Sequence, residues 1–199
     1  MIAQVRGIVA EKSPTRVVLD VSGVGYEINI PVSTYEKLPN VGGEIRLLTH
    51  LHVREDAMQL FGFSNDKEKK LFQLLIAVSG IGPRLALGVL SGISVEDFSL
   101  AVRNENSAML TRIPGVGKKT AQRLVIELKD KIGKGLDVSP AREIGSVNIL
   151  EEAVLALVSL GYRQTEAQKI VEKVAGEEES LPSIEVLIKK ALQTVVSKR

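Results

Sequence analysis

The stretch IPGVGKKTA, residues 113–121, places two glycines one residue apart and follows them with two lysines at an expected helix start. A second stretch, VSGIGPRLA at residues 78–86, has the same form 35 positions earlier. At this offset Gly80 aligns with Gly115 and Gly82 with Gly117, and the flanking apolar positions also match. Glycine commonly ends one helix and permits a tight turn into the next. The repeat therefore predicts two equivalent units, each a helix, a two-glycine turn and a second helix.

Neither copy has the spacing of a nucleotide-binding loop. A Walker A loop needs a glycine five residues before its Gly-Lys pair, and Arg112 occupies that position. A dinucleotide-binding fingerprint needs a third glycine, but Leu85 and Thr120 stand there. Neither stretch follows an expected strand. The pattern therefore does not predict binding of ATP or of a dinucleotide.

The two turns instead have the features of a phosphate-binding site. Glycine lets another molecule approach the backbone closely, and the first N–H groups of a helix have no partner within the helix. These groups and the positive end of the helix dipole attract anions. Such a site would hold a DNA backbone without reading base edges. The predicted DNA-binding residues are Gly80, Gly82, Arg84, Gly115, Gly117, Lys118, Lys119 and Arg123. The alternative is that the glycines merely end helices and the cations are solvated.

The distribution of charge favours the phosphate interpretation. Residues 1–63 carry 6 basic and 7 acidic side chains, residues 64–135 carry 12 and 7, and residues 136–199 carry 8 and 10. The basic surplus thus coincides with the repeat. With only three tyrosines, four phenylalanines and no tryptophan, the chain has few aromatic side chains for stacking single-stranded bases.

Hydrophobicity patterns divide the chain into three parts and a linker. Residues 1–63 read as short strands joined by turns, which predicts a small barrel. Residues 64–132 have helical spacing, residues 133–148 read as a flexible linker, and residues 149–199 read as three helices with an acidic loop at 177–179. The predicted fold class is α+β and multidomain. Without a long apolar run, we expect no membrane association and a cytoplasmic location.

Catalytic and metal sites are not predicted. The chain has no cysteine, which excludes disulfides and thiolate ligands. His50 and His52 alternate on one strand face, but we interpret them as a surface pair because no third ligand is nearby except Glu55 or Asp56. The two acids alone read as an ordinary charged turn. We therefore expect no catalytic residue, no metal and no cofactor.

A series of motifs across nearly the whole chain resembles the RuvA family, the Holliday-junction-binding subunits of bacterial branch-migration complexes. The motifs are RGIVAEK, GVGYEINIP, THLHVREDAMQLFGF, GIGPRLALGVLSG, IPGVGKKTAQRLVIELKDK and ALVSLGY, in family order. The resemblance implies an N-terminal OB-fold barrel, a middle domain of two helix-hairpin-helix motifs, and a mobile three-helix C-terminal domain.

The resemblance also implies a function and partners. Family members form homotetramers, alone or paired as octamers, that hold a four-way DNA junction open and recruit a RuvB-like hexameric ATPase, with a RuvC-like resolvase in the same complex. Glu55 and Asp56 would be an acidic pin at the junction centre. The C-terminal domain would bind the ATPase, with candidate contacts Leu157, Leu160, Tyr162, Ile170 and Leu187, although most of these must form the core of so small a module. Two other functions remain open. The chain could be a repair nuclease or glycosylase that binds DNA through the same helix-hairpin-helix motifs, or an adaptor that binds no DNA.

Overall fold

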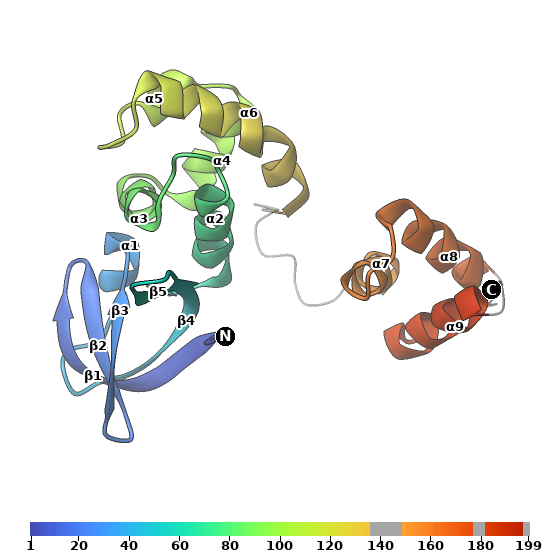
Figure 1. The fold of residues 1–199 in the computed structure, drawn as a ribbon, viewed down its shortest axis with the longest axis horizontal. Helices are drawn as coiled ribbons and strands as arrows, with labels where there is room; N and C mark the ends of the chain where they lie inside the picture. The colour runs from blue at the N-terminus through green and yellow to red at the C-terminus, as the bar shows by residue number, and fades with distance from the viewer. Residues whose placement is uncertain (136–148, 177–181, 197–199) are drawn as a thin grey trace. The chain divides into compact units, whose positions relative to one another are not determined.

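The first 63 residues fold into a closed five-stranded barrel with the order β1-β2-β3-β5-β4 (Figure 1). In β1 (Gln4–Ser13), exposed and buried residues alternate, as expected of a strand with one face on a core. The other strands are β2 (Arg16–Val21), β3 (Val24–Asn29), β4 (Glu44–Val53) and β5 (Met58–Phe63). The pairing of β3 with β5 is parallel and closes the barrel. The predicted small barrel is thus confirmed.

Helices follow the barrel, as the change of periodicity at Ser64 predicts. A short helix, α1 (Val32–Tyr35), lies between β3 and β4. The helices after the barrel are α2 (Asp66–Ile76), α3 (Pro83–Gly92), α4 (Val95–Arg103), α5 (Ser107–Leu110) and α6 (Lys118–Gly135). One glycine turn joins α2 to α3, and the other joins α5 to α6.

The two turns have equivalent hydrogen bonds. Ile81 N–H donates to the Val78 carbonyl at 3.1 Å, and 35 residues later Val116 N–H donates to the Ile113 carbonyl at 3.0 Å. Ala86 N–H donates to the Gly82 carbonyl, as Ala121 N–H does to that of Gly117. The predicted internal repeat is therefore a structural repeat.

The barrel and the helices that follow it share one compact unit, residues 1–138, although the sequence suggests two domains. Phe61 and Phe63 on β5 pack against Phe72 on α2, with ring centroids 5.1 and 4.9 Å apart. All three phenylalanines are buried. The aromatic contact joins the barrel to the first helix-hairpin-helix motif.

The second compact unit, residues 139–199, is a three-helix module of α7 (Ile149–Ser159), α8 (Gln164–Gly176) and α9 (Ile184–Val196). Each helix contributes to its core, which contains Ala153, Leu157, Ala167, Val171, Val174, Leu187 and Ala191. The predicted three-helix domain is confirmed.

The structure describes residues 1–135, 149–176 and 182–196. Helix α6 continues to Gly135, so residues 133–135, which the sequence places in a linker, are helical. The rest of that expected linker and the acidic loop at 177–179 lie outside the described residues. Within the described ranges, no single helix is long and apolar enough to cross a membrane; by length and composition alone, the pair α3 and α4, bent by 99°, passes the same test.

Candidate nucleic-acid interface

The first glycine of each turn adopts a backbone conformation that other residues rarely adopt. Gly80 has φ +84° and Gly115 has φ +86°, both in the left-handed region. A Cβ atom at Gly115 would also lie 2.9 Å from the Leu85 side chain. Glycine at these two positions is therefore a requirement of the fold.

The second glycine of each turn faces open space. A Cβ atom at Gly82 or Gly117 would have no neighbour within 4 Å. Gly82 is the N-cap of α3, has an extended backbone with φ −88°, and provides no side-chain cap. The missing side chain leaves the helix start accessible, as a bound phosphate would require.

The two helix starts differ in one donor. The first residue of α3 is Pro83, which lacks an N–H group, whereas the first residue of α6 is Lys118. Both helices have first-turn N–H groups without an intrahelical partner.

The fold brings the first turn next to the start of α6, and the two surround one depression of about 230 Å³. Ser79 and Gly80 of the first turn line it together with Lys119, Thr120 and Arg123 of α6. Backbone from one motif and cations from the other thus face the same space. Thr120 and the Ser79 carbonyl are not among the sequence-predicted residues, because their inclusion depends on a contact between segments about 40 residues apart.

Three of the four predicted cations are exposed. Arg84, Lys118 and Lys119 have no ion-pair partner among the described residues. Arg123 differs: its Nη1 donates to the Ser79 carbonyl at 2.7 Å, and its Nε lies 4.0 Å from a carboxylate oxygen of Glu127. Arg123 therefore links the two motifs, while the other three cations have free side chains.

The acidic pair lies at the end of the β4–β5 hairpin. Val53 pairs with Met58 as the last residues of the ladder, and Arg54 N–H donates to the Ala57 carbonyl at 2.8 Å across the turn. Glu55 and Asp56 occupy the middle of this turn and are exposed. The predicted position between two strands is confirmed.

The two histidines are packing residues on the face of the barrel that meets α2. The His50 ring contacts Phe72 edge to face with centroids 5.5 Å apart, and His52 accepts a hydrogen bond from Arg54 Nε at 3.1 Å. Partial burial, together with the charges of His52 and Lys69, lowers the pKa of His50 below its usual 6.5. In the described part of the chain, no group of three or more His, Asp or Glu side chains could hold a metal ion.

The five candidate partner contacts in the three-helix module fall into different environments. Leu157 and Leu187 are completely buried, so their side chains hold the module together and cannot face a partner. Tyr162 and Ile170 are half-buried, and Leu160 is 60% exposed. Two further exposed apolar side chains on α7, Leu155 and Val158, were missed because helical spacing alone does not tell which face is covered.

Profiles of known protein families match all three parts of the chain. Residues 1–62 match the family described as RuvA N terminal domain. Residues 72–130 match the SAM-like helix-hairpin-helix tandem, and residues 148–195 match the RuvA C-terminal domain.

Similar proteins cover nearly the same length. A protein from Methylococcus capsulatus is 47% identical over 98% of this chain and 100% of its own length. A protein from Cronobacter sakazakii is also 47% identical with the same coverage, and one from Haemophilus influenzae is 46% identical over 88% of this chain and 91% of its own. Each is named Holliday junction branch migration complex subunit RuvA. A closed barrel, a tandem of glycine hairpins and a three-helix module thus coincide with the three matched profiles, and with relatives 46–47% identical over most of its length, the chain belongs to the RuvA family.

Proposed function

We propose that this chain binds four-way DNA junctions through their backbone phosphates, irrespective of base sequence, and presents them to a hexameric ATPase for branch migration. One observation carries the proposal: backbone of the first glycine turn and the side chains of Lys119 and Arg123, on the helix that follows the second turn, line a single depression. Backbone N–H groups and cations hold phosphates but do not distinguish bases.

Both backbone groups and side chains of the hairpins would contact phosphates. A Cβ atom at Gly82 or Gly117 would meet no neighbour, so no side chain covers either helix start. Arg84, Lys118 and Lys119 would add charge at the same phosphates, which raises affinity and makes it depend on salt. Arg123 would act on DNA indirectly, by holding the first hairpin at a fixed position through the Ser79 carbonyl.

Junction preference would come from the acidic turn. Carboxylates of Glu55 and Asp56 near a crossover would repel phosphates and favour an open junction over a closed one. A homotetramer would place four such turns against four arms, since closed cyclic symmetry matches the symmetry of the junction. Two such tetramers would be able to enclose one junction.

The proposed partners act on the same DNA, in the cytoplasm. A RuvB-like hexamer would hydrolyse ATP and dock on apolar side chains of the three-helix module, with Leu160 as the most exposed of the predicted contacts. A RuvC-like resolvase would bind the junction that this chain holds open. The chain itself would supply no catalytic group.

The deciding experiment compares binding to a four-way junction and to a linear duplex of the same sequence at matched salt. We expect tighter binding to the junction and a fall in affinity for both DNAs as salt rises. Equal affinity for the two DNAs would refute junction selectivity. Cleavage or base release by the purified protein would favour a repair enzyme, and the absence of any binding would favour an adaptor.

A further inference from the structure

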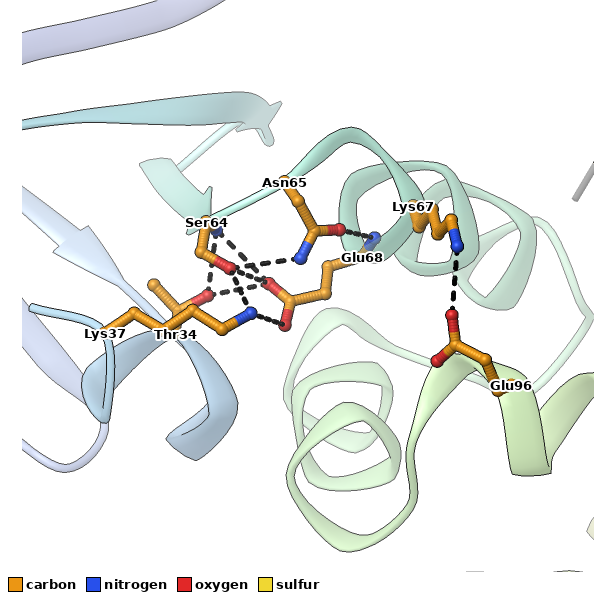
Figure 2. Close-up of polar contacts among 7 residues, drawn as sticks. All are labelled: Thr34, Lys37, Ser64, Asn65, Lys67, Glu68 and Glu96. Carbon is orange, nitrogen blue, oxygen red and sulfur yellow. Dashed lines mark hydrogen bonds and ion pairs between the residues drawn. The ribbon is translucent and has the colours of Figure 1, made fainter. Parts of the chain in front are cut away.

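Among the described residues, Glu68 is the one charged side chain that is buried, with 4% of its surface exposed. Its carboxylate accepts hydrogen bonds from Thr34 Oγ1 at 2.9 Å, from Ser64 N–H at 3.2 Å and from Ser64 Oγ at 3.0 Å. Lys37 Nζ lies 3.9 Å from its other oxygen. Figure 2 shows the carboxylate directed toward Thr34 and Lys37, away from the ion pair between Lys67 and Glu96.

The partners of this carboxylate come from both sides of the joint between barrel and helices. Thr34 and Lys37 belong to the barrel part, in and just after α1, whereas Glu68 lies in the first turn of α2. Ser64 lies between the end of β5 and the start of α2. Asn65 caps α2 by accepting from Glu68 N–H at 2.9 Å, and it also donates to Ser64 Oγ. The network therefore fixes the backbone where the chain leaves the barrel.

Joining two elements through a buried carboxylate carries a desolvation cost. Removing a carboxylate from water costs several kcal/mol, and a well-packed apolar residue is often as stable or more so. The phenylalanine contacts between β5 and α2 already supply apolar adhesion at this joint. The network also fixes the relative orientation of the two elements, because the Thr34 hydroxyl donates to Glu68 and accepts from Ser64 N–H, and both hydrogen bonds require a defined geometry.

The joint lies midway along a segment that connects the acidic turn to the first glycine hairpin. From Glu55 and Asp56, the chain runs through β5, bends at Ser64 and Asn65, continues as α2, and reaches Gly80. Any change of angle at this bend moves the acidic turn relative to the hairpin.

We propose that Glu68 is a positioning residue for junction recognition. Its hydrogen bonds hold the acidic turn at one fixed place relative to the two glycine hairpins, so that repulsion and phosphate binding act on the same junction. Without the carboxylate, the hairpins still bind DNA, but the acidic turn no longer lies at the centre of the bound junction. The effect on DNA binding rests on the proposed function. The effect on the distance between the acidic turn and the hairpins depends on the protein geometry alone.

Three substitutions test the network and one serves as a matched control. Glu68→Gln keeps the shape but places an amide NH2 among donors, and Glu68→Ala removes the acceptor. Thr34→Val removes, at nearly constant volume, the hydroxyl that donates to Glu68 and accepts from Ser64 N–H. Glu96→Gln is the control, because Glu96 also pairs with a lysine of α2, at 3.1 Å, but connects α2 only to α4. All four are made in the full-length chain.

The first readout is a distance that does not involve DNA. The chain has no cysteine, so Ala57→Cys and Gln122→Cys, both at exposed positions, give a single pair of spin labels on the hairpin and on α6. Labelled protein is diluted with unlabelled protein, so that distances between subunits do not contribute. We expect a narrow distance distribution in the parent and in Glu96→Gln, and a broader or shifted one in both Glu68 variants and, less strongly, in Thr34→Val.

The second readout is the preference for a four-way junction over a linear duplex at matched salt. We expect both Glu68 variants to lose about tenfold of this preference, equivalent to about 1.4 kcal/mol, while duplex affinity and its salt slope stay constant.

An unchanged distance distribution in both Glu68 variants overturns the inference, whatever the DNA result. Retained preference despite a broadened distribution also overturns it. If the parent itself shows no junction preference, the proposed function fails, while the distances still decide whether Glu68 sets the geometry. Failure of all three variants to fold overturns the inference too, since Glu68 would then be needed for the fold as a whole.

Discussion

The guanidinium of Arg123, on the second helix-hairpin-helix motif, donates a hydrogen bond of 2.7 Å to the carbonyl of Ser79, on the first. The two residues are 44 positions apart, and a Cβ atom at the adjacent Gly80 would lie 3.3 Å from the same guanidinium. A direct hydrogen bond therefore connects the first glycine turn to the helix that follows the second one.

Lys119→Ala should weaken binding to all DNA sequences alike. Lys119 lines the shared depression and has no ion-pair partner among the described residues. Losing one phosphate contact should reduce the slope of log affinity against log salt by about 1. The slope is measured by titration at several salt concentrations. Lys70→Ala is the control, because Lys70 pairs with Asp66 at 2.7 Å; an unchanged slope in Lys119→Ala would contradict a phosphate contact.

Alanine at the two kinds of glycine should separate stability from binding. Gly115→Ala forces a left-handed backbone and a close contact with Leu85, which should lower the free energy of unfolding by roughly 1–2 kcal/mol from the backbone alone. Gly82→Ala has an ordinary φ of −88° and open space, so its stability should fall less than that of Gly115→Ala, but its methyl group would obstruct a phosphate. Chemical denaturation and DNA titration measure the two effects. Full DNA affinity in Gly82→Ala would indicate that no phosphate approaches this turn.

Replacing Glu55 with Gln and Asp56 with Asn should change how the junction is held. The loss of two negative charges removes repulsion worth up to about 1 kcal/mol per carboxylate at 4 Å in water, so binding to linear duplex should tighten and the preference for the four-way junction should fall. Base pairs at the crossover should open less, as reported by a fluorescent base analogue placed there. Subunit assembly, measured by light scattering, should not change. Glu36→Gln, another exposed acid, is the control and should leave the fluorescence unaltered.

His50 should make the protein less stable as the pH falls below neutrality. Its pKa is lowered in the folded state, so between that pKa and 6.5 the unfolded chain binds more protons and folding is disfavoured. Stability should thus decline from pH 7 toward pH 5.5, and His50→Gln should decline less, as measured by urea denaturation. The lowered pKa values of Glu44, Glu96 and Glu105 act below about 4.5 and do not contribute in this range. Parallel declines in both proteins would exclude His50 as the cause.

Leu160 and Leu157 should behave in opposite ways although both are leucines near the end of α7. Leu157 is completely buried, so Leu157→Ala should cost about 2–5 kcal/mol of stability. Leu160 is 60% exposed, so Leu160→Ala should leave stability unchanged and weaken stimulation of the ATPase on junction DNA. Thermal unfolding and an ATPase assay distinguish the two. Normal stimulation by Leu160→Ala would place the docking surface elsewhere.

Local patterns predict a large part of this structure. The glycine repeat, the barrel and the three-helix module all follow from spacing within short segments, and the acidic turn lies between two strands as expected. Each of these features depends on neighbours in the chain, so its signal is present in the sequence.

Features that depend on distant contacts could not be predicted in this way. Glu68 in SNDKEKK resembles any acid in a first helical turn, and its burial exists only because Thr34 approaches from the barrel. Arg123 resembles a free cation until Ser79 comes within hydrogen-bonding distance. Leu157 and Leu160 differ in exposure only once α8 and α9 cover one side of α7.

The proline at the start of α3 makes the two halves of the repeat unequal. Pro83 withholds one N–H group that the backbone of Lys118 retains, so the first hairpin offers a bound strand one anchor fewer than the second. In the proposed complex, a DNA strand would therefore be held by fewer backbone donors at the first hairpin than at the second.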